Sequence, residues 1–147
     1  MTQEKSTKLI LNNQYVKDLS FENPNSPMSI SKIANNPQIN FNIDINAGKL
    51  NDTSYEVVLT ISADAKDKED EKFLIFLTEL KFAGLFTVKA ESSDEEELKR
   101  ILLIDCPTLL FPFARRIIAD TTREGGFPPL MMEPINFADL YSQNTKH

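Results

Sequence analysis

The sequence predicts an α+β fold, with a four-stranded antiparallel sheet covered by a long helix and a short C-terminal helix. Apolar and polar residues alternate strictly over residues 38–46 and again over 55–65, which is typical of antiparallel strands with one face in water. Helical spacing of apolar residues appears only later in the chain. Strands that precede helices in this way are typical of α+β domains. We expect the strands to form a meander with one face covered by a helix.

The chain has 147 residues, which is enough for one domain with its own hydrophobic core. We therefore expect a single domain over residues 1–147, with flexible ends at 1–7 and 142–147.

The first strand is expected over residues 8–21, with an irregularity near Asn12 and Asn13. A turn-rich stretch follows it, and residues 28–37 carry no pattern that assigns an element. The second strand, 38–46, places its apolar residues on one face: Ile39, Phe41, Ile43 and Ile45. A hairpin connection over 47–52 leads to the third strand.

The third strand, 55–65, repeats the alternation, and the charged residues 64–72 after it are expected to form a solvated hairpin tip. The fourth strand, 73–88, is apolar on both faces, so we expect it to be central in the sheet or covered on both sides. Gly84 within this strand indicates a bulge or close packing.

Ser92 and Ser93 precede a run of acidic residues, a pattern that predicts a serine N-cap and a helix to about residue 104. The pair Cys106–Pro107 is expected to break or kink this helix. The next helix runs over 107–123, contains Pro112 and ends at a Gly-Gly pair. Asn136 is expected to cap a final helix over 137–143.

The sequence argues against an enzyme. The only cysteine, Cys106, is expected to be a small buried core residue, and the only histidine, His147, ends the chain. Catalysis by Ser/His/Asp or Cys/His groups and zinc binding through histidine therefore lack their residues. No glycine-rich phosphate loop occurs. We expect no cofactor and no metal.

The net charge of −6 argues against nucleic acid or an anionic membrane surface as a partner and permits a basic protein partner. No apolar run is long enough to insert into a membrane, and the first residues do not resemble a signal peptide. We expect a cytoplasmic protein.

Two kinds of surface stay open to interpretation. Asp18, Glu22 and Glu79, with Leu77 nearby, belong either to the wet face of the sheet or to a site for a basic partner. The apolar, proline-rich segment 127–137 either closes the core or presents an adaptable binding surface. The apolar face of the long helix is either a core stripe or a subunit interface, with these candidates: Leu109, Phe113 and Ile117.

Three segments resemble one known family. The C-terminal stretch with LFPFAR, GGFPPL and PINFADLY in order, the N-terminal YVKDLSFENPNSP and the strand YEVVLTISADA are similar to the bacterial protein-export chaperone family SecB. The resemblance spans about residues 15–141. It implies an ATP-independent holdase that keeps preproteins unfolded and delivers them to the SecA ATPase. It also implies a homotetramer, assembled as a dimer of dimers through the long helix.

The resemblance also implies residue roles. The surface for the basic, zinc-bearing C-terminal tail of SecA falls on Asp18, Glu22, Leu77 and Glu79. Candidates for the client groove, some of which we expect to belong to the core, are Phe41, Tyr55, Phe127, Leu130, Met132, Phe137 and Tyr141. The charged loop 64–72 and the acidic stretch 90–100 depart from the family pattern.

Two alternatives are kept. A SecB-like chaperone dedicated to a toxin-antitoxin pair would share the fold and lack the SecA surface, so the presence of the four matching residues argues against it. A small-ligand-binding or enzymatic α+β domain would need a convergent polar pocket, and the sequence offers no usable histidine or cysteine and no phosphate loop for one.

Overall fold

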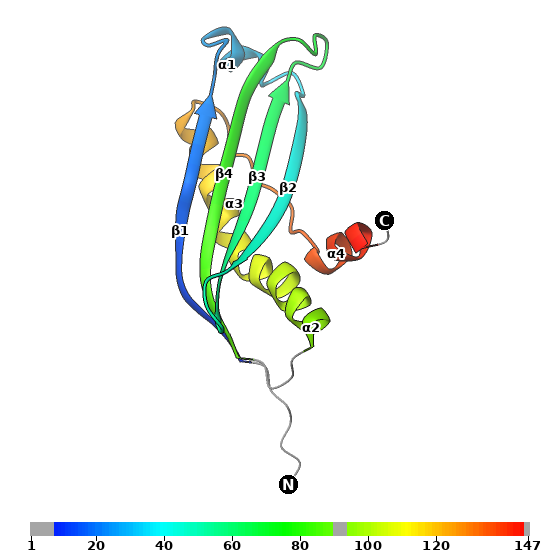
Figure 1. The fold of residues 1–147 in the computed structure, drawn as a ribbon. Helices are drawn as coiled ribbons and strands as arrows, with labels where there is room; N and C mark the ends of the chain where they lie inside the picture. The colour runs from blue at the N-terminus through cyan, green and yellow to red at the C-terminus, as the bar shows by residue number, and fades with distance from the viewer. Residues whose placement is uncertain (1–7, 90–93, 146–147) are drawn as a thin grey trace.

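The strands of the computed structural model, which describes residues 8–89 and 94–145, form one antiparallel sheet with the helices of the C-terminal half on one side (Figure 1). The strands are β1 (Lys8–Glu22), β2 (Gln38–Lys49), β3 (Ser54–Lys66) and β4 (Leu74–Lys89). The helices are α1 (Met28–Lys32), α2 (Glu95–Arg100), the π-helical turn η1 (Ile101–Asp105), α3 (Cys106–Glu124) and α4 (Phe137–Thr145). The predicted sheet with a long and a short C-terminal helix is confirmed.

The strand order is β1-β4-β3-β2, so the predicted meander is wrong. After β1 the chain crosses the end of the sheet through α1 and enters at the opposite edge as β2 (Figure 1). This order puts β4 between β1 and β3, which fits its apolar residues on both faces, because a central strand is shielded best. The segment 28–37, to which the sequence pattern assigned nothing, contains the short helix α1.

The core lies between α3 and the sheet face that α3 covers, which we call the inner face. Every second residue of β3 from Tyr55 to Ala65 is buried there, as the alternation predicted. From α3, Leu110, Ala114 and Ile118 are fully buried against this face. Full burial of a leucine or isoleucine side chain, such as that of Leu110 or Ile118, stabilises the fold by about 1.5–3 kcal/mol relative to exposure.

Gly84 allows α3 to approach β4 closely. A Cβ atom at this position would lie 2.8 Å from Leu110 Cδ2 and 2.5 Å from Phe86 Cε2. The pairing of β4 shows no register shift at Gly84, so close packing, and not a bulge, explains this glycine. The irregularity predicted near Asn12 is confirmed as a register shift between Leu11 and Asn13 in β1.

The sequence predicted a break or a kink at Cys106–Pro107. The helical segment from α2 to α3 is continuous, so the break is wrong, and the irregularity in the helix is the π-helical turn η1 directly before this pair. The backbone N–H of Cys106 bonds to the carbonyl of Ile101, five residues back, and the wider π-helical turn accommodates Pro107 at the start of α3. The N-cap of α2 is Asp94, whose side chain accepts a hydrogen bond from the Glu96 N–H. Ser92 and Ser93, the predicted caps, lie outside the described residues.

The C-terminal end of α3 and the start of α4 follow the sequence signals. Gly125 N–H bonds to the carbonyl of Thr121 at 3.0 Å, and Gly126 has a positive φ of 93°, which favours glycine. Asn136 Oδ1 accepts from the Asp139 N–H at 3.1 Å and so caps α4 as predicted. Helix α4 continues to Thr145, beyond the predicted end at residue 143. Residues 1–7 and 146–147, expected to be flexible, lie outside the described residues.

The charged hairpin loop is only partly the solvated tip that the sequence predicted. Residues 68–72 are exposed, but Asp67 is buried. Its Oδ2 forms an ion pair of 3.0 Å with Lys32 Nζ of α1, and the same ammonium lies 5.5 Å from the centre of the Phe73 ring. This contact joins α1 to the β3–β4 hairpin, and the Lys32 ammonium lowers the pKa of the Asp67 carboxyl.

Candidate functional site

The outer face of the sheet, opposite α3, brings together the four residues that the sequence singled out for a basic partner. In the antiparallel pairing of β1 with β4, Glu22 lies opposite Leu77 and Ser20 lies opposite Glu79. Asp18 lies opposite Lys81 on the same face. Because directly paired residues point to the same side of a sheet, Asp18, Glu22, Leu77 and Glu79 form one surface, which we call the acidic surface.

The acidic surface is open to solvent. Asp18 and Glu22 are exposed, whereas Leu77 and Glu79 are half-buried on the central strand. Within the described part of the chain, the three carboxylates form no ion pair. The arrangement therefore presents uncompensated negative charge around one apolar side chain, which suits a basic ligand with an apolar residue.

Strand β3 continues this surface on the far side of β4. Asp64 lies opposite Leu77, and Ser62 lies opposite Glu79. The Asn40 Nδ2 of β2 donates a hydrogen bond of 3.2 Å to Asp64 Oδ1. The sequence alone does not single out Asp64, because the alternation of β3 gives its face but not its neighbour on β4.

Farther along the outer face, the charges neutralise one another. Glu56 accepts hydrogen bonds from Lys17 Nζ at 2.7 Å and from the Tyr15 hydroxyl at 2.5 Å. The Lys17 ammonium and then the Tyr15 hydroxyl lower the pKa of Glu56, and the hydrogen bond to Glu56 raises the pKa of Tyr15. Uncompensated negative charge is thus concentrated toward the end of the face that holds Glu22 and Leu77.

An apolar groove runs between β2 and the segment after α3. It has a volume of about 530 Å³ and is lined by Ile39, Phe41 and Ile43 of β2 and by residues 130–135. The side chains of Phe41 and Met131 are 42% and 65% exposed. Three of the predicted groove residues line it: Phe41, Leu130 and Met132.

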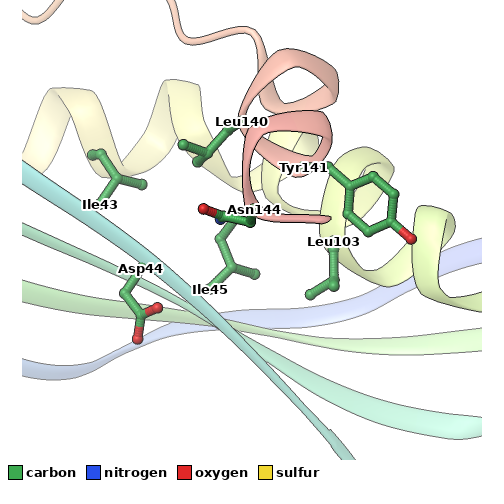
Figure 2. A pocket seen from close by; sticks show the side chains of 7 residues that line it. All are labelled: Ile43, Asp44, Ile45, Leu103, Leu140, Tyr141 and Asn144. Carbon is green, nitrogen blue, oxygen red and sulfur yellow. The ribbon is translucent and has the colours of Figure 1, made fainter. Parts of the chain in front are cut away.

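A second, smaller hollow of about 130 Å³ lies under α4 (Figure 2). Ile43 lines both hollows, so they adjoin along β2. Figure 2 shows Leu140 and Tyr141 of α4 and Leu103 of η1 around it, with Asp44 pointing to the other side of β2. The Tyr141 hydroxyl donates to Glu96 Oε2 at 3.1 Å and ties α4 to α2, and burial followed by this bond raises the pKa of Tyr141.

The remaining groove candidates belong to the core of the protomer. Tyr55, Phe127 and Phe137 are 7%, 4% and 2% exposed and line neither hollow, and Met132, although it lines the groove, is 7% exposed. Besides Pro134, seven apolar lining residues were not among the candidates: Ile39, Ile43, Ile45, Leu103, Met131, Ile135 and Leu140. The alternation of β2 had already placed Ile39, Ile43 and Ile45 on the same face as Phe41.

The side of α3 that faces away from the core carries an apolar stripe. Leu109 and Phe113 are 45% and 48% exposed, while Ile117 is half-buried and packs on the edge of the core. Two of the three predicted interface residues are therefore open in the single protomer.

Cys106 is fully buried, and burial raises the pKa of its thiol to about 12, which confirms its expected place in the core. Among residues 8–89 and 94–145, no cluster of three or more histidine, cysteine or acidic side chains could hold a metal ion. Over the same residues, no helix combines the length and apolar character needed to span a membrane.

Comparison with known proteins matches the chain to one family. The family described as Preprotein translocase subunit SecB matches residues 2–147. A Protein-export protein SecB of Parvibaculum lavamentivorans is 51% identical over 130 residues, which cover 88% of this chain and 74% of that protein. Another, of Rhodospirillum centenum, is 47% identical over 140 residues, which cover 95% of this chain and 81% of that protein.

A solved structure shares the fold. The SecB-like chaperone of Mycobacterium tuberculosis, in complex with a ChAD peptide from the HigA1 antitoxin, superposes with a TM-score of 0.73. The superposition covers 86% of this chain and 90% of that chain, at 17% sequence identity. At this identity the likeness supports the architecture and says nothing about the ligand of the present chain.

Proposed function

Because the chain belongs to the SecB family of protein-export chaperones, we propose that it binds unfolded preproteins and delivers them to the SecA ATPase. The observation that carries the proposal is the strand register that gathers Asp18, Glu22, Leu77 and Glu79 on one open face. The apolar groove lies at a different place, along the edge strand β2. Client and carrier therefore have separate surfaces.

The groove along β2 suits an unfolded client. An unfolded chain exposes apolar side chains, and their burial stabilises the complex by about 25 cal/mol per Å² of apolar surface. Flexible methionines and a proline-stiffened segment accept varied side chains without demanding one sequence. Binding by burial alone consumes no nucleotide, so we propose an ATP-independent holdase without a cofactor. Folding of the client hides the same apolar residues, which favours slow folders as clients.

The acidic surface suits the basic, zinc-bearing C-terminal tail of SecA. Opposite charges steer the encounter and fix the register of the partner, and Leu77 provides an apolar contact in their midst. We place this encounter in the cytoplasm, where preproteins are made.

We further propose a homotetramer, a dimer of dimers that is held through α3. The exposed side chains of Leu109 and Phe113 support this, because a protomer that stays alone gains nothing from apolar residues in water. Several protomers would also give one client several grooves, and binding at many sites offsets weak contact at each.

The alternative function, a chaperone that serves only a toxin-antitoxin pair, is disfavoured. The relatives at 51% and 47% identity are protein-export proteins, whereas the chaperone seen with an antitoxin peptide is only 17% identical. The enzymatic alternative finds no support in the groove, whose lining is mostly apolar.

Calorimetric titration with the zinc-bearing C-terminal peptide of SecA tests the proposal. The wild-type protein should bind the peptide. Glu79→Lys should abolish binding at unchanged oligomer mass, because it replaces a central carboxylate with a positive charge that repels the basic peptide. Glu71→Lys, with the same change of charge in the exposed hairpin tip, is the control and should bind almost normally. A folded wild-type protein that fails to bind the peptide would refute the SecA part of the function.

A further inference from the structure

We propose that Asp64 is a fifth contact residue of the acidic surface, and that a basic partner segment crosses β1, β4 and β3 with one basic side chain on each side of Leu77. This inference rests on the proposed function, since it assumes that the acidic surface binds a basic partner. It adds a residue and a direction of approach that follow from the strand register.

The register places Leu77 between two carboxylates. Glu22 of β1 is its direct partner on one side, and Asp64 of β3 is its direct partner on the other. Neighbouring strands lie about 4.8 Å apart, so the backbones that carry the two carboxylates are separated by about 10 Å. The next row repeats the arrangement with Ser20, Glu79 and Ser62, which adds a third carboxylate beside the first two.

Along the strand direction, lysines bound the acidic surface. Lys66 follows Asp64 by two residues on β3, and Lys81 follows Glu79 by two residues on β4. Both lysines therefore lie on the outer face of the sheet, as the two carboxylates do. Beyond Lys81, Glu56 is already paired with Lys17 and hydrogen-bonded to Tyr15. A basic segment that ran along a strand would meet these cations, whereas a segment that crosses the strands meets Glu22, Glu79 and Asp64.

The environment of Asp64 favours a contact role. Within the described residues, its carboxylate forms no ion pair, and it accepts a hydrogen bond of 3.2 Å from the side-chain amide of Asn40. That hydrogen bond orients one oxygen and leaves the second available to a ligand. Asp64 is half-buried beside Leu77, so a contact made there is less screened by water than one at the rim of the face.

The pattern defines the chemistry of the partner. It is a segment with two lysine or arginine side chains that straddle one apolar residue, which packs on Leu77. The charges set the position of the segment, and the apolar contact adds affinity that salt does not screen.

Calorimetry with the zinc-bearing C-terminal peptide of SecA provides the test, with Asp64→Asn as the variant. The amide keeps an acceptor for Asn40 and removes only the charge. Loss of one ion pair between Asp64 and the peptide should raise the Kd by roughly two- to fivefold and reduce the dependence of the Kd on salt. Asp52→Asn is the matched control, because it changes the net charge equally from the exposed β2–β3 turn. It should change the Kd by less than the Asp64 variant does.

A double-mutant cycle tests the direction of the segment. Each lysine or arginine of the peptide is replaced in turn by glutamine and titrated against Asp64→Asn and Glu22→Gln. Two different peptide residues should couple, one to Asp64 and the other to Glu22. Coupling of one peptide residue to both positions, or of none to Asp64, would overturn the crossing arrangement.

The possible failures are distinguishable. If wild-type protein binds the peptide and Glu79→Lys abolishes binding, but Asp64→Asn behaves like Asp52→Asn, the role of Asp64 is refuted and the proposed function stands. If folded wild-type protein does not bind at all, the proposed function fails and the inference fails with it. Thermal unfolding and oligomer mass of each variant show that the fold is intact.

Discussion

At the scale of single residues, the hydroxyl of Thr122 connects the long helix to the groove. Thr122 is fully buried on α3 and bonds to the carbonyls of Ile118 and Ala119 at 3.1 and 3.0 Å. The same oxygen accepts a hydrogen bond of 2.9 Å from the N–H of Leu130, which lines the groove. One buried side chain therefore fixes the start of the segment that lines the apolar groove.

Thr122→Val should destabilise the protein by about 1–3 kcal/mol, because the Leu130 N–H loses its acceptor while the shape of the side chain is kept. Urea unfolding at a fixed protomer concentration measures the loss. Thr121→Val, one residue earlier and half-exposed, is the control and should cost less. Equal stability of the two variants would contradict the role given to the hydroxyl.

Lys81 lies directly opposite Asp18 of the acidic surface in the pairing of β1 with β4. Removing its charge with Lys81→Gln should strengthen the binding of the basic SecA peptide by roughly two- to fivefold, since a like charge beside the ligand is lost. Calorimetry at two salt concentrations checks this, and the gain should shrink at high salt. Weaker binding by this variant would show that Lys81 itself contacts the peptide.

At the scale of elements, α1 and the β3–β4 hairpin are joined by the Lys32–Asp67 ion pair. The pair lowers the folded-state pKa of Asp67 below its unfolded value of about 3.9, so its stabilisation is present above that pH and is lost as the pH falls through the folded-state pKa. Asp67→Asn should therefore lower the Tm at neutral pH, and the difference from wild type should vanish in acid.

Thermal unfolding of wild type and Asp67→Asn between pH 2 and 8 measures this convergence. Glu71→Gln, in the exposed tip of the same hairpin, provides the control for a lost carboxylate. A difference in Tm that stays constant down to the lowest pH would show that the ion pair is not its source.

The edge strand β2 offers a test of the groove with neighbouring residues. Phe41→Asp puts a charge into the apolar hollow and should weaken the binding of an unfolded client by at least tenfold, whereas Asn42→Asp makes the same residue on the opposite face and should not. Fluorescence titration with a reduced, unfolded client measures both. Equal effects of the two substitutions would place the client elsewhere.

Local patterns predicted most elements, and long-range pairing explains what they missed. The alternation in β2 and β3 and the Asn136 cap depend on neighbouring residues, so the sequence alone reveals them. The place of β1 beside β4 and the contact of Asp64 with Leu77 depend on residues far apart in the chain. The π-helical turn before Pro107 depends on how the helix packs, so no local signal distinguished it from a break.

For the groove, too, the sequence does not show which apolar residues are buried in the core and which stay exposed. Phe41 and Phe127 are equally apolar in sequence, but one lies on an edge strand and the other in an aromatic cluster with Phe21 and Phe76. Only the packing separates an exposed groove residue from a core residue here. The four residues of the acidic surface were found through family resemblance, because their charges alone were compatible with any wet face of a sheet.

At the scale of the whole molecule, the exposed stripe of α3 predicts assembly. Phe113→Asp should dissociate the tetramer that we propose into smaller species with little loss of protomer structure, because the side chain is 48% exposed and outside the core. Light scattering gives the mass, and circular dichroism verifies the fold. Arg116→Asp, on the exposed side one turn away, tests whether any new charge on α3 has this effect. An unchanged mass for Phe113→Asp would contradict assembly through this stripe.

The alternation of side chains in β2 has a consequence for genetics. Ile43 lines the hollows on one side of the strand, and its neighbour Asp44 points to the other side (Figure 2). A saturation mutagenesis screen of β2 in living cells should therefore separate the variants by whether the substituted residue has an odd or an even number. Along this strand, odd-numbered positions should yield defects in the capture of secretory precursors, and even-numbered positions should leave capture intact.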